Sequence, residues 1–511
     1  MQKCKSKVVY KNYNFNQNLL LPPSLVELIS PNHPVRVVSQ VVDNLNLDPV
    51  FKKYLGGGCP AYHPRMMLKI LVYGYVTNLY SSRKIEQALH ENIHFMWLSG
   101  RSYPDHNTIN RFRSDRLKGV LREVFSQVVL LLMDHGHIDL KEAYLDGTKI
   151  EANANKYTFV WGKAIKTSRQ RIKRQLDELW AYAESVAKKE LEHNEPASFE
   201  EIDAEQVAQT IETIDKALEG KQVDKKVKQK LNYARKNWPD NLKKYNGQEK
   251  QLGDRNSMSK TDPDATFMRM KEDYMLNGQL KPAYNWQLST QNQYILGYSL
   301  HQAATDTGTL PAHMDTIKQQ LGTTPEVLVA DAGYGSEQNY EYLEENQIEA
   351  YVKFNNFHKE QTQKWKKNPH RVENLYYNKE LDCYFCPMGQ PMDFIGRCSY
   401  TTKLGYKQYY KRYQAKNCNG CPMRGPCHKG KRNRIIEMNP RLVRYKQEAR
   451  DKLTSEQGLK YRSQRPADVE AVFGNIKYNH NFKRFMLRSL EKTEIEAGLI
   501  SLAHNLRKLA N

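Results

Sequence analysis

The stretch VLVAD at residues 327–331 decides the fold class, because it is a continuous apolar run that ends in an aspartate. Such a run is typical of a strand that is buried on both faces of a sheet. Strand composition also marks YLDGTKIEA at 144–152, NWQLSTQ at 285–291 and YILGYSL at 294–300. Only two residues separate the last two stretches, which therefore predict a β-hairpin.

Helices are expected between and after these strands. Apolar residues at helical spacing predict helices over 307–321 and 338–346, and a further strand is expected at 350–354. Strands that alternate with covering helices define an α/β sheet.

Residues 1–135 carry mostly helical patterns. Pro64 suits the first turn of one helix, and Ser81 suits the N-cap of another. A third helix, which contains Arg111 and Arg113, is basic. Short helices joined by tight turns predict a helix-turn-helix-like DNA-binding module, and an all-helical packing or dimerisation domain is the alternative.

The composition indicates a globular chain with a polyanionic partner. Of the 511 residues, 39% are hydrophobic and 26% are charged, and the net charge is +21. Such an excess favours a nucleic acid or a membrane surface. No apolar run reaches the roughly 18–20 residues that span a bilayer, and no apolar segment follows the basic residues 1–7. We therefore expect nucleic acid as partner, no membrane association, and a cytoplasmic, nucleoid-associated protein.

Residues 163–254 are highly charged and form a separate segment. Residues 169–192 and 200–218 have helical patterns with many i,i+4 charge pairs. They predict a helical hairpin inserted into the sheet domain.

Six of the eight cysteines lie within residues 383–427. Cys383 with Cys386, and Cys418 with Cys421, form two C-x-x-C pairs. Four thiolates on two such pairs predict a structural zinc site in a zinc-ribbon-like insertion, with Cys427 as an alternative ligand. Reduced, metal-free thiols are the alternative.

Residues 400–465 contain 18 Lys or Arg but only 4 Asp or Glu. Tyrosines are interleaved with the first of these basic residues. We expect the basic residues to neutralise phosphates and the tyrosines to stack on unpaired bases, or else a solvated basic face. The tyrosines are Tyr400, Tyr406, Tyr409, Tyr410 and Tyr413.

Two aspartates end strands of the predicted sheet, where ligands bind in open α/β sheets. Asp146 precedes Gly147, and Asp331 lies just before Gly333, so a ligand can approach the backbone closely at both strands. Glu470, on a covering helix, is a candidate third carboxylate. Three acids repel one another unless a cation joins them. Two Mg²⁺ ions about 3.5–4 Å apart, bound by such acids, catalyse phosphodiester chemistry.

The helix at residues 467–477 has two faces. One is an apolar stripe made of Val469, Val472, Phe473 and Ile476. The adjacent face carries Glu470, Gly474 and Lys477, so a carboxylate and an ammonium flank a spot without a side chain.

Together these motifs resemble bacterial insertion-sequence transposases of the DDE class, over nearly the whole chain. The N-terminal motifs are similar to the helical domain that precedes the catalytic core in such enzymes. The motifs are YHPRMML (62–68), SSRKIE (81–86), PDH (104–106), YLDGTK (144–149), TDPDA (261–265), VADAGY (329–334), VEAVFGNIK (469–477) and LAHNL (502–506).

The resemblance implies an RNase H-like core with the catalytic triad Asp146, Asp331 and Glu470, which would bind Mg²⁺ or Mn²⁺. It implies hydrolysis at transposon ends, strand transfer into target DNA, and a homodimer that joins two terminal inverted repeats. Lys477 would contact a phosphate near the cut, and Arg465 and Arg484 join the DNA-binding set. A structure-specific nuclease without strand transfer and a non-catalytic DNA-binding derivative are the alternatives.

Related enzymes carry a tyrosine and an arginine at fixed offsets before the glutamate. Those offsets hold Ser463 and Pro466 here, whereas Tyr461, Arg462 and Arg465 lie nearby but out of register. The predicted organisation is an N-terminal helical DNA-binding domain (1–135), the start of the core (136–162), the charged helical insertion (163–254), the continued core (255–375), the cysteine-rich insertion (376–435) and a basic segment with the final core helices (436–511).

Overall fold

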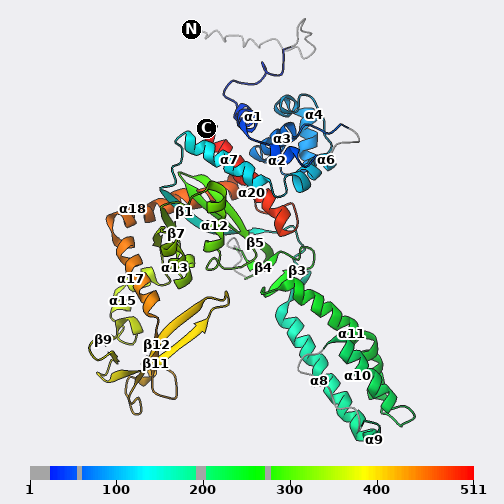
Figure 1. Ribbon diagram of the computed structural model, residues 1–511, viewed down its shortest axis with the longest axis vertical. Coiled ribbons are helices and arrows are strands. Elements are labelled where there is room, and N and C mark those ends of the chain that lie inside the picture. Colours follow the sequence, from blue (N-terminus) through cyan, green and yellow to red (C-terminus); the bar gives the residue numbers. More distant parts are fainter. Residues whose placement is uncertain (1–22, 55–59, 192–202, 271–277, 511) are drawn as a thin grey trace, which may run out of the picture. The chain divides into compact units, whose positions relative to one another are not determined.

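In the computed structural model, residues 23–54, 60–191, 203–270 and 278–510 are described (Figure 1). The chain divides into two compact units, one reaching to Arg113 and including residues from Leu506 onward, the other running from Ser114 to Asn505. Two predictions fall outside the described residues: the absence of a signal segment after residues 1–7, and the start of a helix at residues 200–202. Within the described ranges, no helix combines the length and apolar character that crossing a bilayer requires.

The N-terminal unit is helical, as predicted. Pro64 is the first residue of one helix, and Ser81 is the N-cap residue of the next. The Asp105 carboxylate accepts a hydrogen bond from the Thr108 amide (2.8 Å) and so caps the following helix. The helices are α1 (Pro34–Asn44), α2 (Asp48–Phe51), α3 (Pro64–Val76), α4 (Ser82–Glu91), α5 (Ile93–Ser99) and α6 (His106–Arg111).

The second unit is built on a mixed sheet with the order β4-β5-β1-β7-β8, and β6 pairs with β5. β1 is antiparallel to β5 and parallel to β7, which in turn is parallel to β8. The predicted hairpin is confirmed: Asn292 and Gln293 form its turn with positive φ of 51° and 60°. The strands are β1 (Glu142–Glu151), β4 (Thr266–Arg269), β5 (Leu280–Gln291), β6 (Tyr294–His301), β7 (Val327–Ala330) and β8 (Glu349–Val352).

Helices cover both faces of this sheet. Successive residues of a strand point to opposite faces. Ser289 of β5 bonds to His313 of α12 (2.8 Å), whereas the next residue, Thr290, bonds to Asp468 of η4 (2.5 Å). The α/β architecture is therefore confirmed. The elements that cover the sheet are α7 (Leu121–Asp134), α12 (Leu310–Leu321), α13 (Glu337–Glu345), α17 (Pro440–Thr454), α18 (Glu456–Arg465), η4 (Pro466–Glu470) and α20 (Leu490–Leu509).

The charged insertion contains three long helices, not the predicted pair: α8 (Gly162–Val186), α10 (Ala204–Ala217) and α11 (Lys225–Leu252) (Figure 1). They share an apolar core of their own. α11 buries Leu231, Ala234, Trp238 and Leu242. The helical pattern of α11 is hard to recognise in the sequence for two reasons. Its apolar residues are sparse among lysines, and Pro239 lies inside the helix.

The cysteine-rich insertion forms a separate five-stranded sheet with the order β13-β12-β11-β10-β9. Its small core contains Met392, Tyr413 and Ile436. The strands are β9 (Tyr376–Asn378), β10 (Cys383–Phe385), β11 (Pro391–Thr401), β12 (Lys407–Ala415) and β13 (Ile435–Met438).

Candidate active site

Asp146 lies within the central strand β1, and its side chain is only 10% exposed. Antiparallel pairing sets it opposite Leu288 of β5, on the sheet face that η4 covers. Its neighbour Gly147 pairs with Gln287 and faces α12. The backbone amide of Gly147 also donates a hydrogen bond to the Asp146 carboxylate (2.8 Å). The strand register therefore fixes the direction of this carboxylate.

Asp331 immediately follows β7, the parallel neighbour of β1. Leu145 pairs with Ala330, so Asp331 is the register neighbour of Asp146 at the carboxyl end of the strand. The Asp331 carboxylate caps a short 3-10 helix, η2 (Ala332–Tyr334), by accepting a hydrogen bond from the Ala332 amide. The two aspartates therefore lie on neighbouring strands as predicted, but only Asp331 follows a strand end, because β1 continues past Asp146 to Glu151.

Glu470 ends a π-helical turn that continues α18. In a π turn the hydrogen bonds run from i to i+5, so one turn contains an extra residue. Arg465, the last residue of α18, is therefore one turn away from Glu470 although the two are five positions apart in the sequence. A second helical turn, α19 (Ala471–Gly474), and a second π turn, η5 (Asn475–Asn479), follow.

One guanidinium joins all three predicted carboxylates. Arg465 Nη2 lies 3.2 Å from Asp146 Oδ2 and 3.8 Å from an oxygen of Asp331, and its Nη1 lies 2.8 Å from Glu470 Oε1. The Arg465 side chain is 7% exposed, whereas the carboxylates of Asp331 and Glu470 are about half exposed. Three residues that are remote in sequence thus meet at one buried positive charge.

The donor atoms at this point suit a divalent cation, because Mg²⁺ prefers carboxylate oxygens. The carboxylates are nevertheless turned toward Arg465. Within the described ranges, no three His, Cys, Asp or Glu side chains lie close enough together to hold a metal ion. The residues fit Mg²⁺ or Mn²⁺ by their chemistry, and binding would require the guanidinium to release them.

A hydrogen-bonded network lies behind Asp146 on the α12 side of the sheet. Asn285 (2.7 Å) and Gln287 (3.0 Å) donate to the Asp306 carboxylate, and the Tyr334 hydroxyl donates to Gln287. Burial, together with the nearby carboxylates, raises the pKa of Tyr334 and keeps its phenol neutral. A β-carbon at Gly147 would lie 2.3 Å from Gln287 Nε2, so this packing requires glycine. No motif in the sequence pointed to Asp306, which lies in the loop between β6 and α12.

Lys353 is a further basic residue at this edge, and sequence reasoning missed it. It directly follows β8, and its amide donates to the Ala330 carbonyl, one residue before Asp331. Burial and the neighbouring Arg465 lower the pKa of Lys353, whereas Asp331 acts in the opposite direction. The available signal was its place near the end of the strand expected at 350–354, which in the structure ends at Val352.

Three residues of the predicted DNA-binding set are buried, namely Arg465, Lys477 and Arg113. Lys477 is 6% exposed on η5, and Arg113 is 4% exposed. Arg113 donates to the Tyr80 carbonyl (2.8 Å) inside the N-terminal unit, which favours a structural role. Arg111 and Arg484 are exposed, and Arg484 donates to the carbonyls of Ala152 (3.2 Å) and Ala154 (3.3 Å).

The apolar stripe predicted beside Glu470 is confirmed. Val469, Val472, Phe473 and Ile476 are all buried. A β-carbon at Gly474 would meet no atom within 4 Å, so packing within the chain does not require this glycine.

The cysteines do not support the predicted zinc site. No three of Cys383, Cys386, Cys418, Cys421 and Cys427 are grouped as metal ligands in the described residues. Cys386 and Cys418 pack against the small apolar core instead. Near them, the guanidinium of Arg434 donates to Cys427 Sγ (3.1 Å), where a zinc ion would repel it.

Two protein-family models match the chain. The first, described as a transposase DDE domain, matches residues 385–510, which include Glu470. The second, described as a transposase domain (DUF772), matches residues 23–115. No curated protein matches the chain. The two matches lie toward opposite ends of the chain, and they support the predicted resemblance to insertion-sequence transposases of the DDE class.

Proposed function

We propose that this transposase cuts transposon ends and transfers them into target DNA with a metal-dependent, RNase H-like core. One observation carries the proposal: Asp146, Asp331 and Glu470 converge on Arg465 although they come from three separate parts of the chain. The sheet order β6-β5-β1-β7-β8, with an acid on β1 and another directly after β7, supports the RNase H-like assignment.

Each residue has a distinct task in this proposal. Asp146 provides a rigid, buried ligand, and Asp331 and Glu470 provide ligands that are open to solvent. Two Mg²⁺ or Mn²⁺ ions held there would activate the attacking oxygen and stabilise the leaving one. Arg465 neutralises the carboxylates before that, and its released guanidinium then binds the phosphate. Lys353 adds positive charge on the same side.

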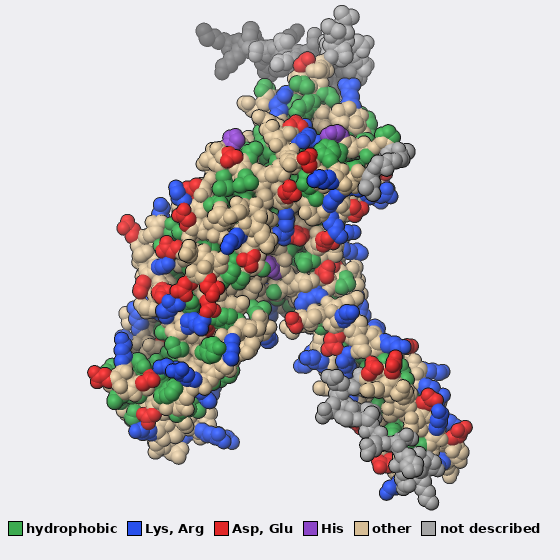
Figure 2. Space-filling model, viewed as in Figure 1, with side chains coloured by type: hydrophobic (Ala, Val, Ile, Leu, Met, Phe, Trp, Pro, Cys, Tyr) green, Lys and Arg blue, Asp and Glu red, His purple; other side chains and the backbone are tan. Residues whose placement is uncertain are grey.

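DNA substrates follow from this chemistry. Terminal inverted repeats and target DNA are the proposed partners, and a homodimer is proposed because two ends must be joined. The net charge of +21 supports polyanion binding. Figure 2 shows Lys and Arg side chains dispersed over the visible face among acidic ones rather than gathered in one patch.

The test uses the full chain with labelled transposon-end DNA and Mg²⁺ on a denaturing gel. We expect Asp146→Asn to abolish cleavage and to retain end binding. Joining of the labelled end to a plasmid would identify strand transfer, whereas cleavage without joining would identify a nuclease. Full cleavage by Asp146→Asn would reject the assignment.

A further inference from the structure

The outer part of the β11–β12 hairpin forms a two-stranded ribbon, residues 397–411. β10 pairs with β11 only at residues 391–392, and β13 pairs with β12 only at residues 411–414. Beyond these points β11 and β12 pair with each other alone. The alternation of side chains therefore gives the ribbon two faces.

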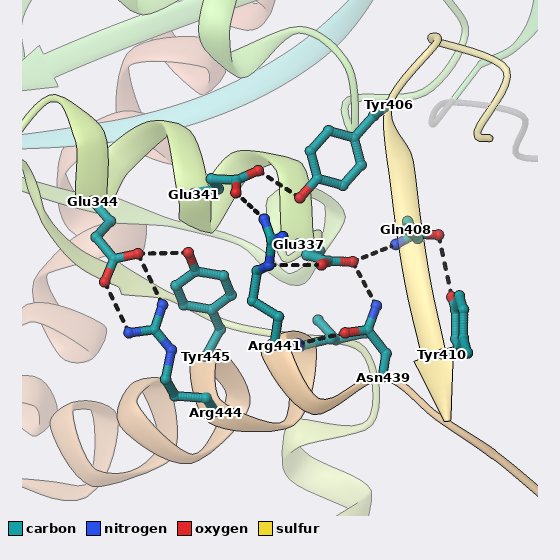
Figure 3. Close-up of polar contacts among 11 residues, drawn as sticks. Glu337, Glu341, Glu344, Tyr406, Gln408, Tyr410, Asn439, Arg441, Arg444 and Tyr445 are labelled. Carbon is teal, nitrogen blue, oxygen red and sulfur yellow. Dashed lines mark hydrogen bonds and ion pairs between the residues drawn. The ribbon is translucent and has the colours of Figure 1, made fainter. Parts of the chain in front are cut away.

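The inward face of the ribbon is hydrogen-bonded to helix α13 of the core (Figure 3). Gln408 Nε2 donates to the buried Glu337 carboxylate of α13 (2.9 Å), which also accepts from Asn439 (2.6 Å). The Tyr406 hydroxyl donates to Glu341 (2.6 Å), and Tyr410 bonds to Gln408 (3.2 Å).

These contacts bear on the expectation that five tyrosines stack on bases, which burial rules out for Tyr413. Tyr413 is buried and donates to Asp382 (2.7 Å), and Tyr400 donates to Glu437 (2.9 Å). Together with Tyr406 and Tyr410, four of the five hydroxyls are thus engaged within the chain. The Tyr409 hydroxyl makes no such hydrogen bond among the contacts described, and its side chain lies on the outward face.

The outward face of the ribbon is basic and hydroxyl-rich. Arg397, Ser399 and Thr401 lie opposite Lys411, Tyr409 and Lys407, respectively. All of them are exposed except Lys411, which is half-buried and pairs with Asp382 (3.4 Å) at the inner end of the ribbon. Tyr409 is 52% exposed, and no Asp or Glu lies between residues 394 and 415. Arg, Lys, Ser, Thr and Tyr are the side chains that contact DNA backbones.

The ribbon tip adjoins the loop that borders the carboxylates. A β-carbon at Gly308 would lie 2.6 Å from Leu404 Cδ1, so the tip touches this loop. From the same loop, the Thr307 hydroxyl donates to the carbonyl of Gly333 (3.2 Å), two residues beyond Asp331. DNA cut at the carboxylates would therefore extend across the ribbon.

We propose that the outward face of the ribbon binds duplex DNA beside the cleavage site. Arg397 and Lys407 bind phosphates, and Tyr409 lies against the groove. The proposal rests on the proposed function. A two-stranded β-ribbon fits the B-DNA major groove, and the fixed inward face holds this ribbon in place without an ordering cost.

The test measures DNA binding by the full chain. A fluorescein-labelled 30-bp duplex of mixed sequence, and one of its single strands, are titrated by anisotropy at several salt concentrations. For Arg397→Ala with Lys407→Ala, we expect at least tenfold weaker duplex binding, and a salt slope shallower by about 1.8 because two phosphate contacts are lost. Tyr409→Ala should weaken duplex binding and Tyr409→Phe should not.

The matched control is Lys379→Ala with Lys429→Ala, two exposed lysines of the same insertion outside the ribbon. It should keep the wild-type slope, and all variants should melt like the wild type. The proposal would be overturned if the ribbon variant kept the wild-type salt slope, or if it lost affinity for the single strand but not for the duplex. If the wild type did not cleave transposon-end DNA, the proposed function would be rejected. The salt slope of duplex binding would still show whether the ribbon binds DNA.

Discussion

Replacing Arg465 by methionine tests whether this guanidinium is the internal counter-ion of the active site. Removing one partner of a buried ion pair costs about 3–5 kcal/mol, because the other charge stays buried. Only Asp146 is deeply buried here; the half-exposed Asp331 and Glu470 contribute about 1 kcal/mol or less each. We therefore expect Arg465→Met to lower the free energy of unfolding in EDTA by about 3 kcal/mol.

The same substitution should strengthen metal binding. In the wild type, a cation must displace the ion pairs of Arg465, whereas in the variant the three carboxylates repel one another until a cation binds. We expect the dissociation constant for Mn²⁺ to fall at least about tenfold, which corresponds to about 1.4 kcal/mol. Calorimetric titration and the Mn²⁺-dependent rise in melting temperature would measure this change.

Two further variants make the result specific. Arg462→Met removes an arginine from the same helix whose guanidinium donates to the Leu453 carbonyl (3.1 Å), so it should leave metal affinity unchanged. Arg465→Lys keeps the charge but loses the forked geometry, and it should fall between Arg465→Met and the wild type. If Arg465→Met matches the wild type both in stability without metal and in Mn²⁺ affinity, the counter-ion role is refuted.

Three other perturbations follow from the structure. Gly147→Ala drives a β-carbon into Gln287 and should destabilise the protein by about 1–3 kcal/mol in urea unfolding, whereas Gly474→Ala should be neutral or slightly stabilising yet reduce cleavage if DNA approaches there. Burial lowers the pKa of His313 to about 3, so the unfolded chain alone is protonated between pH 6.5 and 3. The wild type should lose about 1.4 kcal/mol more than His313→Gln for each pH unit below 6.5, and equal losses would contradict this. Lys353→Met should slow cleavage about tenfold or more at an unchanged melting temperature, and an unchanged rate would exclude Lys353 from the site.

Much of the fold could be predicted because its elements have strong local patterns. The run at residues 327–331 and the hairpin on either side of Asn292 are recognisable from composition and turn chemistry alone. The third helix of the insertion was missed because α11 buries few apolar residues among many lysines. The cysteines show the limit of motif spacing, since two C-x-x-C pairs do not by themselves determine whether the pairs approach each other, and the described residues do not support the zinc site.

For the candidate active site, the sequence motifs singled out the three carboxylates that meet in the structure, but residue spacing misplaced the arginine that joins them. An α-helical register places residues three or four apart on one face. By that rule Arg465, five residues before Glu470, lies out of register, and Pro466 takes its place. The π turn adds one residue and returns Arg465 to the face of Glu470. Because local hydrogen bonding sets this register, a count of residues between motif positions is reliable only where the helix is regular, and π turns concentrate at functional sites. The irregular helix is therefore the physical reason that one guanidinium reaches three carboxylates, and the Arg465 variants test that geometry directly.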